Sequence, residues 1–217
     1  MAEELSLRER KKRETRERIA DVAMGLFMLR GFERVTVAEV AEAADVSVNT
    51  VFNYFRTKED LFFDRQDVVV ESLGRVVAGR EPGESAVEAV RRDFGAALER
   101  RDWRYGITGG APDFFRMVTE SPALVTRTRQ MHEQREDYLA RVLADETDAD
   151  PDDPTPRLVA ALLAALTRTV SEEFLRRRLA GEAIEAVIPA VRAAADRAFD
   201  LLETGCGAYA VKATPPA

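Results

Sequence analysis

The chain has 217 residues, of which 46% are hydrophobic and 33% charged, and its formal net charge is −7. This length and apolar content suffice for a small domain and a larger one with its own core. With one cysteine, Cys206, and one histidine, His132, the chain has no internal disulfide and no zinc site of clustered Cys and His ligands. No apolar run approaches the roughly twenty residues of a membrane span, and no apolar secretory core follows the first residues. We therefore expect a soluble, cytoplasmic protein.

A helix is predicted over residues 8–30. Apolar residues recur on one face at intervals of three and four, which is typical of a helix with one buried side. They are Ile19, Val22, Ala23, Leu26 and Phe27. Gly31 suits the left-handed position that often ends a helix.

Three polar residues then mark three further helix starts. Thr36 and Glu39 have the spacing of a capping box, which predicts a helix of about two turns from Val37. Ser47 is a good N-cap for a second short helix, and Thr57 for a third. We expect the second short helix to bury Val51, Phe52 and Phe55.

Two short helices joined by three or four residues cannot lie antiparallel, so they cross steeply and leave the second one protruding. A protruding helix of this size fits the major groove of DNA. The first long helix and Phe32 would cover the back of the pair and complete a three-helix core. The segment from Gly31 to Leu61 is therefore interpreted as a DNA-reading head.

This part of the chain resembles the tetracycline-repressor (TetR) family of transcriptional regulators over about residues 15–65. The matching positions are Ile19, Ala23, Phe27, Gly31, Phe32, Thr36, Val37, Val40, Ala41, Ala44, Val46, Ser47, Thr50, Val51, Phe55, Lys58, Glu59, Asp60 and Leu61. Three positions depart from the family's commonest pattern: Asn49 stands where glycine is frequent, Phe52 where tyrosine is, and Tyr54 where histidine is. Phe52 loses a possible phenol contact with DNA, whereas Asn49 gains an amide that can pair with an adenine edge.

The predicted DNA contacts fall into two groups. Exposure and side-chain chemistry favour Asn49 as the base reader, with Val48 against a thymine methyl and Asn53 as a second amide. Sugar-phosphate contacts are expected from Thr36, Ser47, Thr50, Tyr54 and Lys58. The resemblance implies this role for Thr36, Thr50, Tyr54 and Lys58. A competing interpretation is that Thr36, Ser47 and Thr57 serve only as helix caps, and both roles can coexist.

The head is nearly neutral, unlike the rest of the chain. Residues 1–60 hold eleven basic and twelve acidic side chains, a net charge of −1, which leaves −6 for the remainder. The strongest basic run, residues 10–13, adjoins the head. It is either a solvated helix face or an arm along phosphates, where each contact adds affinity and salt dependence.

Beyond the head the chain has helical periodicity and no sustained strand-like alternation, which predicts an all-α fold. Helices are expected over residues 58–80, 84–101, 112–119, 122–146, 155–179 and 182–202. The predicted organisation is a helix-turn-helix DNA-binding domain with a basic N-terminal arm over 1–57, a helical ligand-binding and dimerisation domain over 58–204, and a disordered tail over 205–217.

The last two long helices have broad apolar faces that are rich in small residues, which allows close helix approach. On helix 155–179 the face comprises Leu158, Ala161, Leu162, Ala165, Leu166, Thr169 and Val170. On helix 182–202 it comprises Ile184, Val187, Ile188, Val191, Ala194, Ala195, Ala198 and Leu201. These faces either fill the core of one protomer or form a homodimer interface. The family resemblance implies the homodimer, which would present two heads to a palindrome.

Most bulky side chains outside the head lie in the middle helices. The candidates for lining an effector pocket are Trp103, Tyr105, Phe114, Phe115, Met117, Met131, His132 and Tyr138. Most clusters of this kind are ordinary core, and a lone helical histidine is more often on the surface. By loose similarity, residues 114–124 point to a lipophilic or acyl-type effector.

Catalytic chemistry is missing from the sequence. We find no nucleophile elbow, no metal-ligand cluster and no phosphate-binding glycine loop, because residues 106–110 lack the following Lys-Ser/Thr. We expect no cofactor and no enzyme activity. The sequence predicts a dimeric repressor of a DNA operator that is released by a small molecule. A helical carrier without operator binding and a small helical enzyme are the alternatives.

Overall fold

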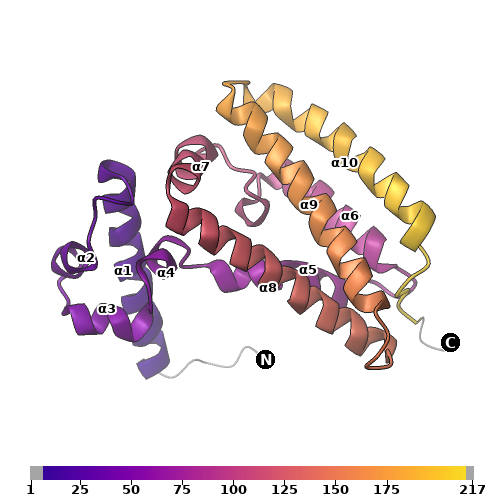
Figure 1. Cartoon of the computed structure of the whole chain (residues 1–217), viewed down its shortest axis with the longest axis horizontal. Helices are drawn as coiled ribbons and strands as arrows, with labels where there is room; N and C mark the ends of the chain where they lie inside the picture. The colour runs from indigo at the N-terminus through magenta and orange to yellow at the C-terminus, as the bar shows by residue number, and fades with distance from the viewer. Residues whose placement is uncertain (1–6, 214–217) are drawn as a thin grey trace. The chain divides into compact units, whose positions relative to one another are not determined.

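The computed structural model describes residues 7–213, which form two compact units. Unit 1 contains the chain up to Gln66 together with Met117–Arg127, and unit 2 contains Asp67–Arg116 and the residues from Thr128 on. Every regular element within residues 7–213 is a helix (Figure 1). The predicted all-α class, an N-terminal helix-turn-helix followed by a larger helical domain, is confirmed. The first residues of the predicted arm, 1–6, lie outside the described part.

Unit 1 begins with the four helices of the reading head. They are α1 (Leu7–Arg30), α2 (Val37–Ala43), α3 (Val48–Tyr54) and α4 (Lys58–Phe62). Phe27, Phe32 and Phe62 form the centre of the core, with ring centroids 5.1 to 5.9 Å apart. Such aromatic contacts add to the hydrophobic stabilisation of the large buried rings. The core therefore holds α1 and α4 against the back of α2 and α3.

The predicted helix starts in the head are confirmed. Thr36 and Glu39 form the complete capping box of α2, and the Ser47 side chain accepts the Thr50 amide at the start of α3. Thr57 and Asp60 form a second capping box, at α4. Gly31 has φ +84° and donates its amide to the Phe27 carbonyl at 2.8 Å, so it ends α1 as predicted.

The turn between α2 and α3 is tight and left-handed. Asp45 adopts φ +52°, and the Val46 amide donates to the Ala41 carbonyl at 3.0 Å. Asp is among the few residues other than glycine that adopt this conformation readily. The turn therefore directs α3 away from the axis of α2, as the spacing of the two starts predicted.

The prediction of one helix over residues 58–80 is wrong. The chain forms α4, which ends at Phe62, and a separate α5 (Gln66–Ala78). Phe63 leaves the helical region with φ −102° and ψ +50°. Leu61 and Phe62 are buried in the head, so their packing fixes the direction of the chain at this point. No glycine or proline marks the break, which is why the helical period did not reveal it.

The remaining helices follow the predicted order. They are α6 (Ala86–Arg100), α7 (Ala111–Glu120), α8 (Pro122–Thr147), α9 (Thr155–Leu179) and α10 (Ile184–Cys206). A short 3-10 helix, η1 (Trp103–Tyr105), was not predicted. It lies between Arg101 and Gly106, both with positive φ, and three residues are too few for a periodic signal.

In unit 2, α9 and α10 lie side by side and α6 packs against both (Figure 1). The buried phenylalanines Phe94, Phe174 and Phe199 come from these three helices. Five residues of the predicted dimerisation faces are buried in this core: Ile184, Val187, Val191 and Ala195 of α10, and Val170 of α9. Their burial in one protomer corrects that part of the predicted interface.

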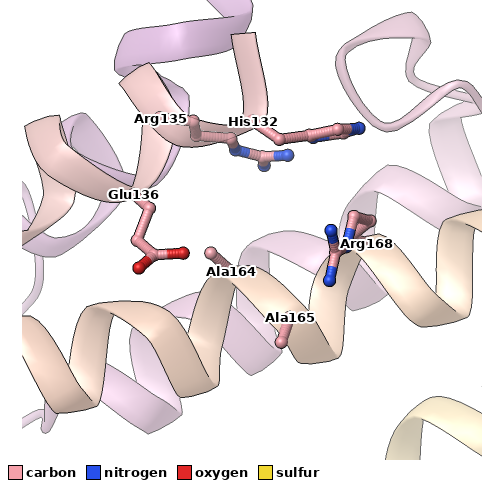
Figure 2. A pocket seen from close by; sticks show the side chains of 6 residues that line it. All are labelled: His132, Arg135, Glu136, Ala164, Ala165 and Arg168. Carbon is pink, nitrogen blue, oxygen red and sulfur yellow. The ribbon is translucent and has the colours of Figure 1, made fainter. Parts of the chain in front are cut away.

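A small cavity of about 30 Å³ lies between α8 and α9 of unit 2 (Figure 2). It is lined by His132, Arg135, Glu136, Ala164, Ala165 and Arg168. That volume holds one or two waters, and it is far below the several hundred Å³ of a drug-sized pocket.

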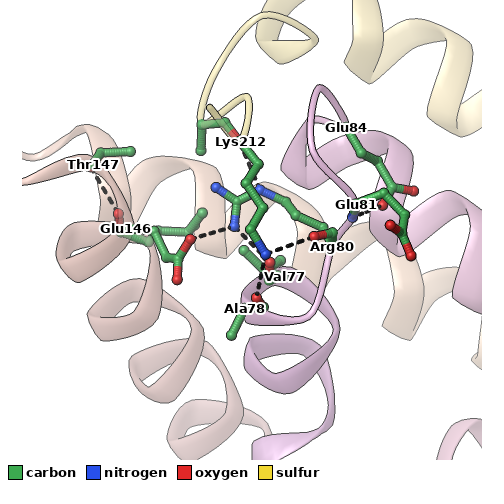
Figure 3. A network of polar contacts seen from close by, with 10 residues as sticks. Val77, Ala78, Arg80, Glu81, Glu84, Glu146, Thr147 and Lys212 are labelled. Atoms are coloured by element: carbon green, nitrogen blue, oxygen red, sulfur yellow. Dashed lines mark hydrogen bonds and ion pairs between the residues drawn. The ribbon is translucent and has the colours of Figure 1, made fainter. Parts of the chain in front are cut away.

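The predicted disordered tail is wrong for residues 205–213. Helix α10 continues to Cys206, and residues 207–213, here called the C-terminal clasp, return to the loop before α6. Lys212 donates its amide to the Glu84 carbonyl at 3.1 Å and its Nζ to the Arg80 carbonyl at 2.8 Å (Figure 3). The buried Arg80 donates to Glu146 at 2.8 Å and to the Ala210 carbonyl at 3.1 Å. Residues 214–217 lie outside the described part.

Candidate nucleic-acid interface

One face of helix α3 is exposed, and the opposite face is buried in the head. Val48, Asn49, Phe52 and Asn53 are exposed, and their spacing places them on one side of the helix. Val51 is buried on the opposite side. The exposed face carries two amides, a branched aliphatic group and an aromatic ring, which suit contacts with base edges and thymine methyl groups.

The prediction that Phe52 is buried is wrong, because its side chain is 49% exposed. Val51 and Phe55 lie four residues apart and both face the core. Phe52 follows Val51 directly, so it is rotated by about 100° from the buried side. Its ring instead joins the exposed face of α3.

The Thr36 and Ser47 hydroxyl groups, which are predicted to contact phosphate, act as helix caps. The Thr36 hydroxyl and amide each donate to Glu39 Oε2 at 2.8 Å. The Thr50 amide donates to Ser47 Oγ at 3.0 Å, and the two hydroxyl oxygens lie 2.8 Å apart. Thr36 and Ser47 are also exposed, so the capping role does not remove them from the surface.

Lys58 and Tyr54 are half-buried. The Lys58 Nζ lies 4.2 Å from the centre of the Phe32 ring and donates to the Glu33 carbonyl at 3.5 Å. Burial lowers the pKa of Lys58, and the negative charge of Glu33 is the largest of the effects that oppose this shift. The ammonium thus lies against the turn that follows α1, where it makes a cation-π contact with Phe32.

Arginines of α1 hold the head together, a role that the sequence did not reveal. Arg18 Nη1 donates to the Ala44 carbonyl and Arg16 Nη2 to the Asp64 carbonyl, both at 2.5 Å. Arg30 Nη2 contacts Glu39 Oε1 at 2.6 Å. The hydrogen bonds from Arg30 and Thr36 lower the pKa of Glu39 to about 2. Helix charge pairs on solvated faces are common, so the pattern alone could not separate these arginines from surface ones.

The basic run at residues 10–13 lies in the first turns of α1, on an exposed part of the helix. Arg10 and Arg13 form exposed pairs with Glu14 and Glu17, each at 3.8 Å. Pairs of this kind contribute little to stability, so the two arginines can exchange partners at low cost.

The junction of α7 and α8 belongs to the head. Ser121 is buried and donates its hydroxyl to Glu33 Oε1 at 2.5 Å. Arg127 Nη2 donates to Asp60 Oδ1 at 2.8 Å and to Gln66 Oε1 at 2.7 Å. Met117 also lies in unit 1. These contacts join residues more than sixty positions apart, and a single sequence gives no local signal for them.

The structure does not bring the eight predicted effector residues together around one cavity. Only His132 lines the cavity between α8 and α9. Tyr105 and Met131 are buried, Trp103 is exposed, and Phe114 and Phe115 pack edge to face at 5.5 Å. Tyr138 covers Gly74 of α5. Arg135, which the sequence did not single out, is the buried charge at this cavity.

Two family models together match most of the chain. Residues 19–64 match bacterial regulatory proteins of the tetR family, and residues 84–207 match the MftR C-terminal domain. The first match covers the second half of α1 and all of α2 to α4, and the second covers α6 to α10. The chain belongs to the TetR family.

Two curated TetR-family relatives are similar to this chain. The HTH-type transcriptional regulator TcmR of Streptomyces glaucescens is 33% identical over 194 residues, which cover 88% of this chain and 85% of that protein. The transcriptional repressor KstR of Rhodococcus jostii is 29% identical over 147 residues, covering 61% of this chain and 69% of that protein. The solved structure of NalD, a repressor from Pseudomonas aeruginosa, supports the fold alone, with 18% identity, 87% and 97% coverage and a TM-score of 0.52.

The TetR-family assignment establishes the broad function. The chain is a DNA-binding transcriptional regulator of the repressor type, and it is not an enzyme. The sequence prediction of a TetR-type regulator is confirmed. Within residues 7–213 no helix is both long enough and apolar enough to cross a membrane.

Proposed function

We propose that this TetR-family regulator binds a palindromic DNA operator as a homodimer and is released by a small-molecule effector. The observation that carries the proposal is the exposed face of α3, Val48, Asn49, Phe52 and Asn53, on a helix whose other side is buried. A rigid helix with amides on its outer face suits direct readout in the major groove. Such a protein would act in the cytoplasm, where a bacterial operator is found.

The proposed DNA contacts divide by chemistry. Asn49 reads a base edge, Asn53 supplies a second amide and Val48 contacts a thymine methyl group. Thr36, Ser47, Thr50, Tyr54 and Lys58 bind sugar-phosphate and set the register. Phe52 is added to the base-facing set because its ring is exposed beside Asn49.

The proposed dimer uses α9 and α10. Leu158 and Leu162 are 60% and 47% exposed on one side of α9, and Leu201 is exposed on α10. Exposed leucines in one stripe are typical of a surface that another subunit covers. One reading head contacts few base pairs, whereas two heads about 34 to 36 Å apart read both halves of a palindrome.

The proposed effector response depends on α8. Its first residues, through Arg127, belong to unit 1, and its later residues line the cavity of unit 2. A ligand that prefers one setting of α8 would therefore change the population of DNA-binding states. A coupling of 1 to 3 kcal/mol changes operator affinity by roughly 5- to 150-fold. We propose a lipophilic effector that contacts the bulky side chains of α7 and α8.

The test is fluorescence anisotropy of the full chain with duplex DNA from the region flanking its own coding sequence. We expect saturable binding of two protomers per duplex, with log affinity falling linearly as log salt rises. A scrambled duplex of the same length is the control. Equal affinity for both duplexes at low salt would contradict the proposal. Effector binding without any DNA binding would support the carrier alternative.

A further inference from the structure

Arg135 of α8 is a buried cation with an unused hydrogen-bonding edge. The residue is only 5% exposed, yet neither its Nε nor its Nη2 has a hydrogen-bond partner among the described residues. These two N–H groups lie on the same edge of the planar guanidinium. They form the fork that pairs side-on with the two oxygens of one carboxylate.

The other neighbours of Arg135 are already engaged. Its guanidinium carbon lies 5.1 Å from the centre of the Tyr105 ring, and the Tyr105 hydroxyl donates to Asp93 Oδ2 at 2.9 Å. Asp93 also contacts Arg104 at 3.4 Å. Arg135 therefore contacts the aromatic ring, and Asp93, the carboxylate that accepts from the Tyr105 hydroxyl, already has two other partners. Burying a guanidinium without an anion on its fork is costly.

The guanidinium of Arg135 points into the cavity between α8 and α9 (Figure 2). His132 extends beside it from α8, and Arg168 rises from α9 toward the same space. Ala164 and Ala165 form the small-residue wall, which leaves room at the fork. The volume of about 30 Å³ holds one or two waters, so it admits the oxygens at the end of a ligand and excludes a bulky group.

The electrostatics of the cavity favour an anion. Burial, Arg135 and Arg168 together lower the pKa of His132 to about 4, so the imidazole is neutral at pH 7 and can donate or accept a hydrogen bond. Burial also lowers the pKa of Arg135. Glu136 is the acidic residue of the lining, but it gives the fork no hydrogen bond. Two arginines thus face one carboxylate side chain, and the local charge remains positive.

We propose that this cavity is a subsite for the carboxylate of an organic acid, bound side-on by Arg135 and supported by Arg168 and His132. The inference rests on the proposed function in one respect: the acid is the polar end of the effector. Its apolar body would lie outside the cavity, which has no room for it. The subsite therefore restricts the effector class to small or lipophilic carboxylic acids, and their amides or esters would bind weakly.

The experiment uses the single histidine of the full chain as a reporter. Proton NMR of the His132 ring follows titration with sodium acetate, with acetamide and sodium chloride at matched ionic strength as controls. We expect acetate alone to shift the resonance saturably and to raise the pKa of His132, because a bound anion stabilises the imidazolium. Acetate should also raise the melting temperature.

Three variants locate the site. Arg135→Gln should weaken acetate binding at least about tenfold, since it removes both charge-assisted hydrogen bonds. Arg168→Gln, at an exposed residue, should weaken it several-fold and leaves the core intact. Arg141→Gln removes the same charge from an exposed position of α8 and should bind acetate like the parent chain.

A His132 shift that chloride or acetamide reproduces would overturn the proposal, and so would acetate binding that persists in Arg135→Gln. If Arg135→Gln does not fold, Arg168→Gln decides: acetate affinity unchanged from the parent chain also overturns the proposal. The readout needs no DNA. A chain that binds its operator but not acetate therefore refutes the subsite alone, and a chain that binds acetate but no operator refutes the proposed regulator alone.

Discussion

Arg127 Nη2 lies 2.8 Å from Asp60 Oδ1, across 67 positions of sequence. Asp60 is also the capping carboxylate of α4, where its other oxygen accepts the amides of Arg56 and Thr57 at 3.2 Å each. The start of α4, directly after the reading helix, is therefore held by an arginine of α8. Within unit 1 this pair joins the DNA-reading elements to the helix that also lines the cavity.

Arg127→Met should destabilise the head, because it removes a charged donor and leaves the half-buried Asp60 short of a partner. We expect a loss of about 2 kcal/mol in the free energy of unfolding, measured by urea denaturation with far-UV circular dichroism. Arg129→Met, at an exposed position of the same helix, should change stability by less than about 0.5 kcal/mol. Equal effects of the two variants would show that the Arg127–Asp60 pair is unimportant.

Asn49→Ala should cost about 1 to 3 kcal/mol of operator binding and relax the preference at one base position. Lys58→Ala should instead weaken binding to all sequences and reduce the salt slope by about one. Anisotropy with a set of single-base operator variants separates the two patterns. A uniform loss for Asn49→Ala would mean that this amide binds the backbone.

The double variant Leu158→Glu/Leu162→Glu should be monomeric, because two carboxylates cannot be buried in an apolar helix interface without partners. Light scattering after gel filtration gives the mass directly. Leu29→Glu makes the same change at a leucine of α1 that is 84% exposed, and it should remain dimeric. A double variant with the mass of two protomers would rule out this face of α9 as the interface.

His132 predicts an acid-sensitive component of stability. Its pKa is about 4 in the folded chain against an ordinary 6.5, so the unfolded chain takes up this proton first as the pH falls. The stability that the neutral His132 contributes is fully present above about pH 6.5 and is lost as the pH falls toward about 4. Between pH 7.5 and pH 4.5 the melting temperature of the parent should therefore fall by more than that of His132→Gln. Parallel curves would place His132 in a solvated setting.

Gly74→Ala should destabilise unit 2 although alanine favours helices. A Cβ on Gly74 would lie 2.5 Å from Tyr138 Cε1 and 3.1 Å from Val142 Cγ2. Overpacking of this kind costs about 1 to 3 kcal/mol. Gly95→Ala is the matched control, because its Cβ would meet only Arg192 Nη1 at 3.6 Å. If Gly74→Ala melts at or above the temperature of Gly95→Ala, the contact between α5 and Tyr138 is looser than described.

Local features of the fold could be predicted from sequence, whereas packing between distant segments could not. The caps Thr36, Ser47 and Thr57 act within three residues, so their spacing alone located α2, α3 and α4. The break after Phe62 depends on burial of its ring in the head, which no local pattern encodes.

The same distinction holds for the candidate sites. Asn49 and Asn53 were predicted as exposed residues of α3 and are exposed. Their contacts with DNA stay a prediction. Arg135 resembles any arginine on a charged helix until the neighbouring helices bury it. The predicted effector residues share bulk, but bulk also suits a core, which is where Tyr105 lies.

The C-terminal clasp bears on how the chain is made. Lys212 Nζ donates to the Arg80 carbonyl, 132 positions earlier, and the Lys212 carbonyl accepts the amide of Gly83 at 2.8 Å. During translation, the loop that follows α5 therefore cannot complete its hydrogen bonds until nearly all of the larger unit has been synthesised. Until then the backbone groups of this loop lack their partners and are accessible to chaperones. A chain that terminates before Lys212 would never form these hydrogen bonds.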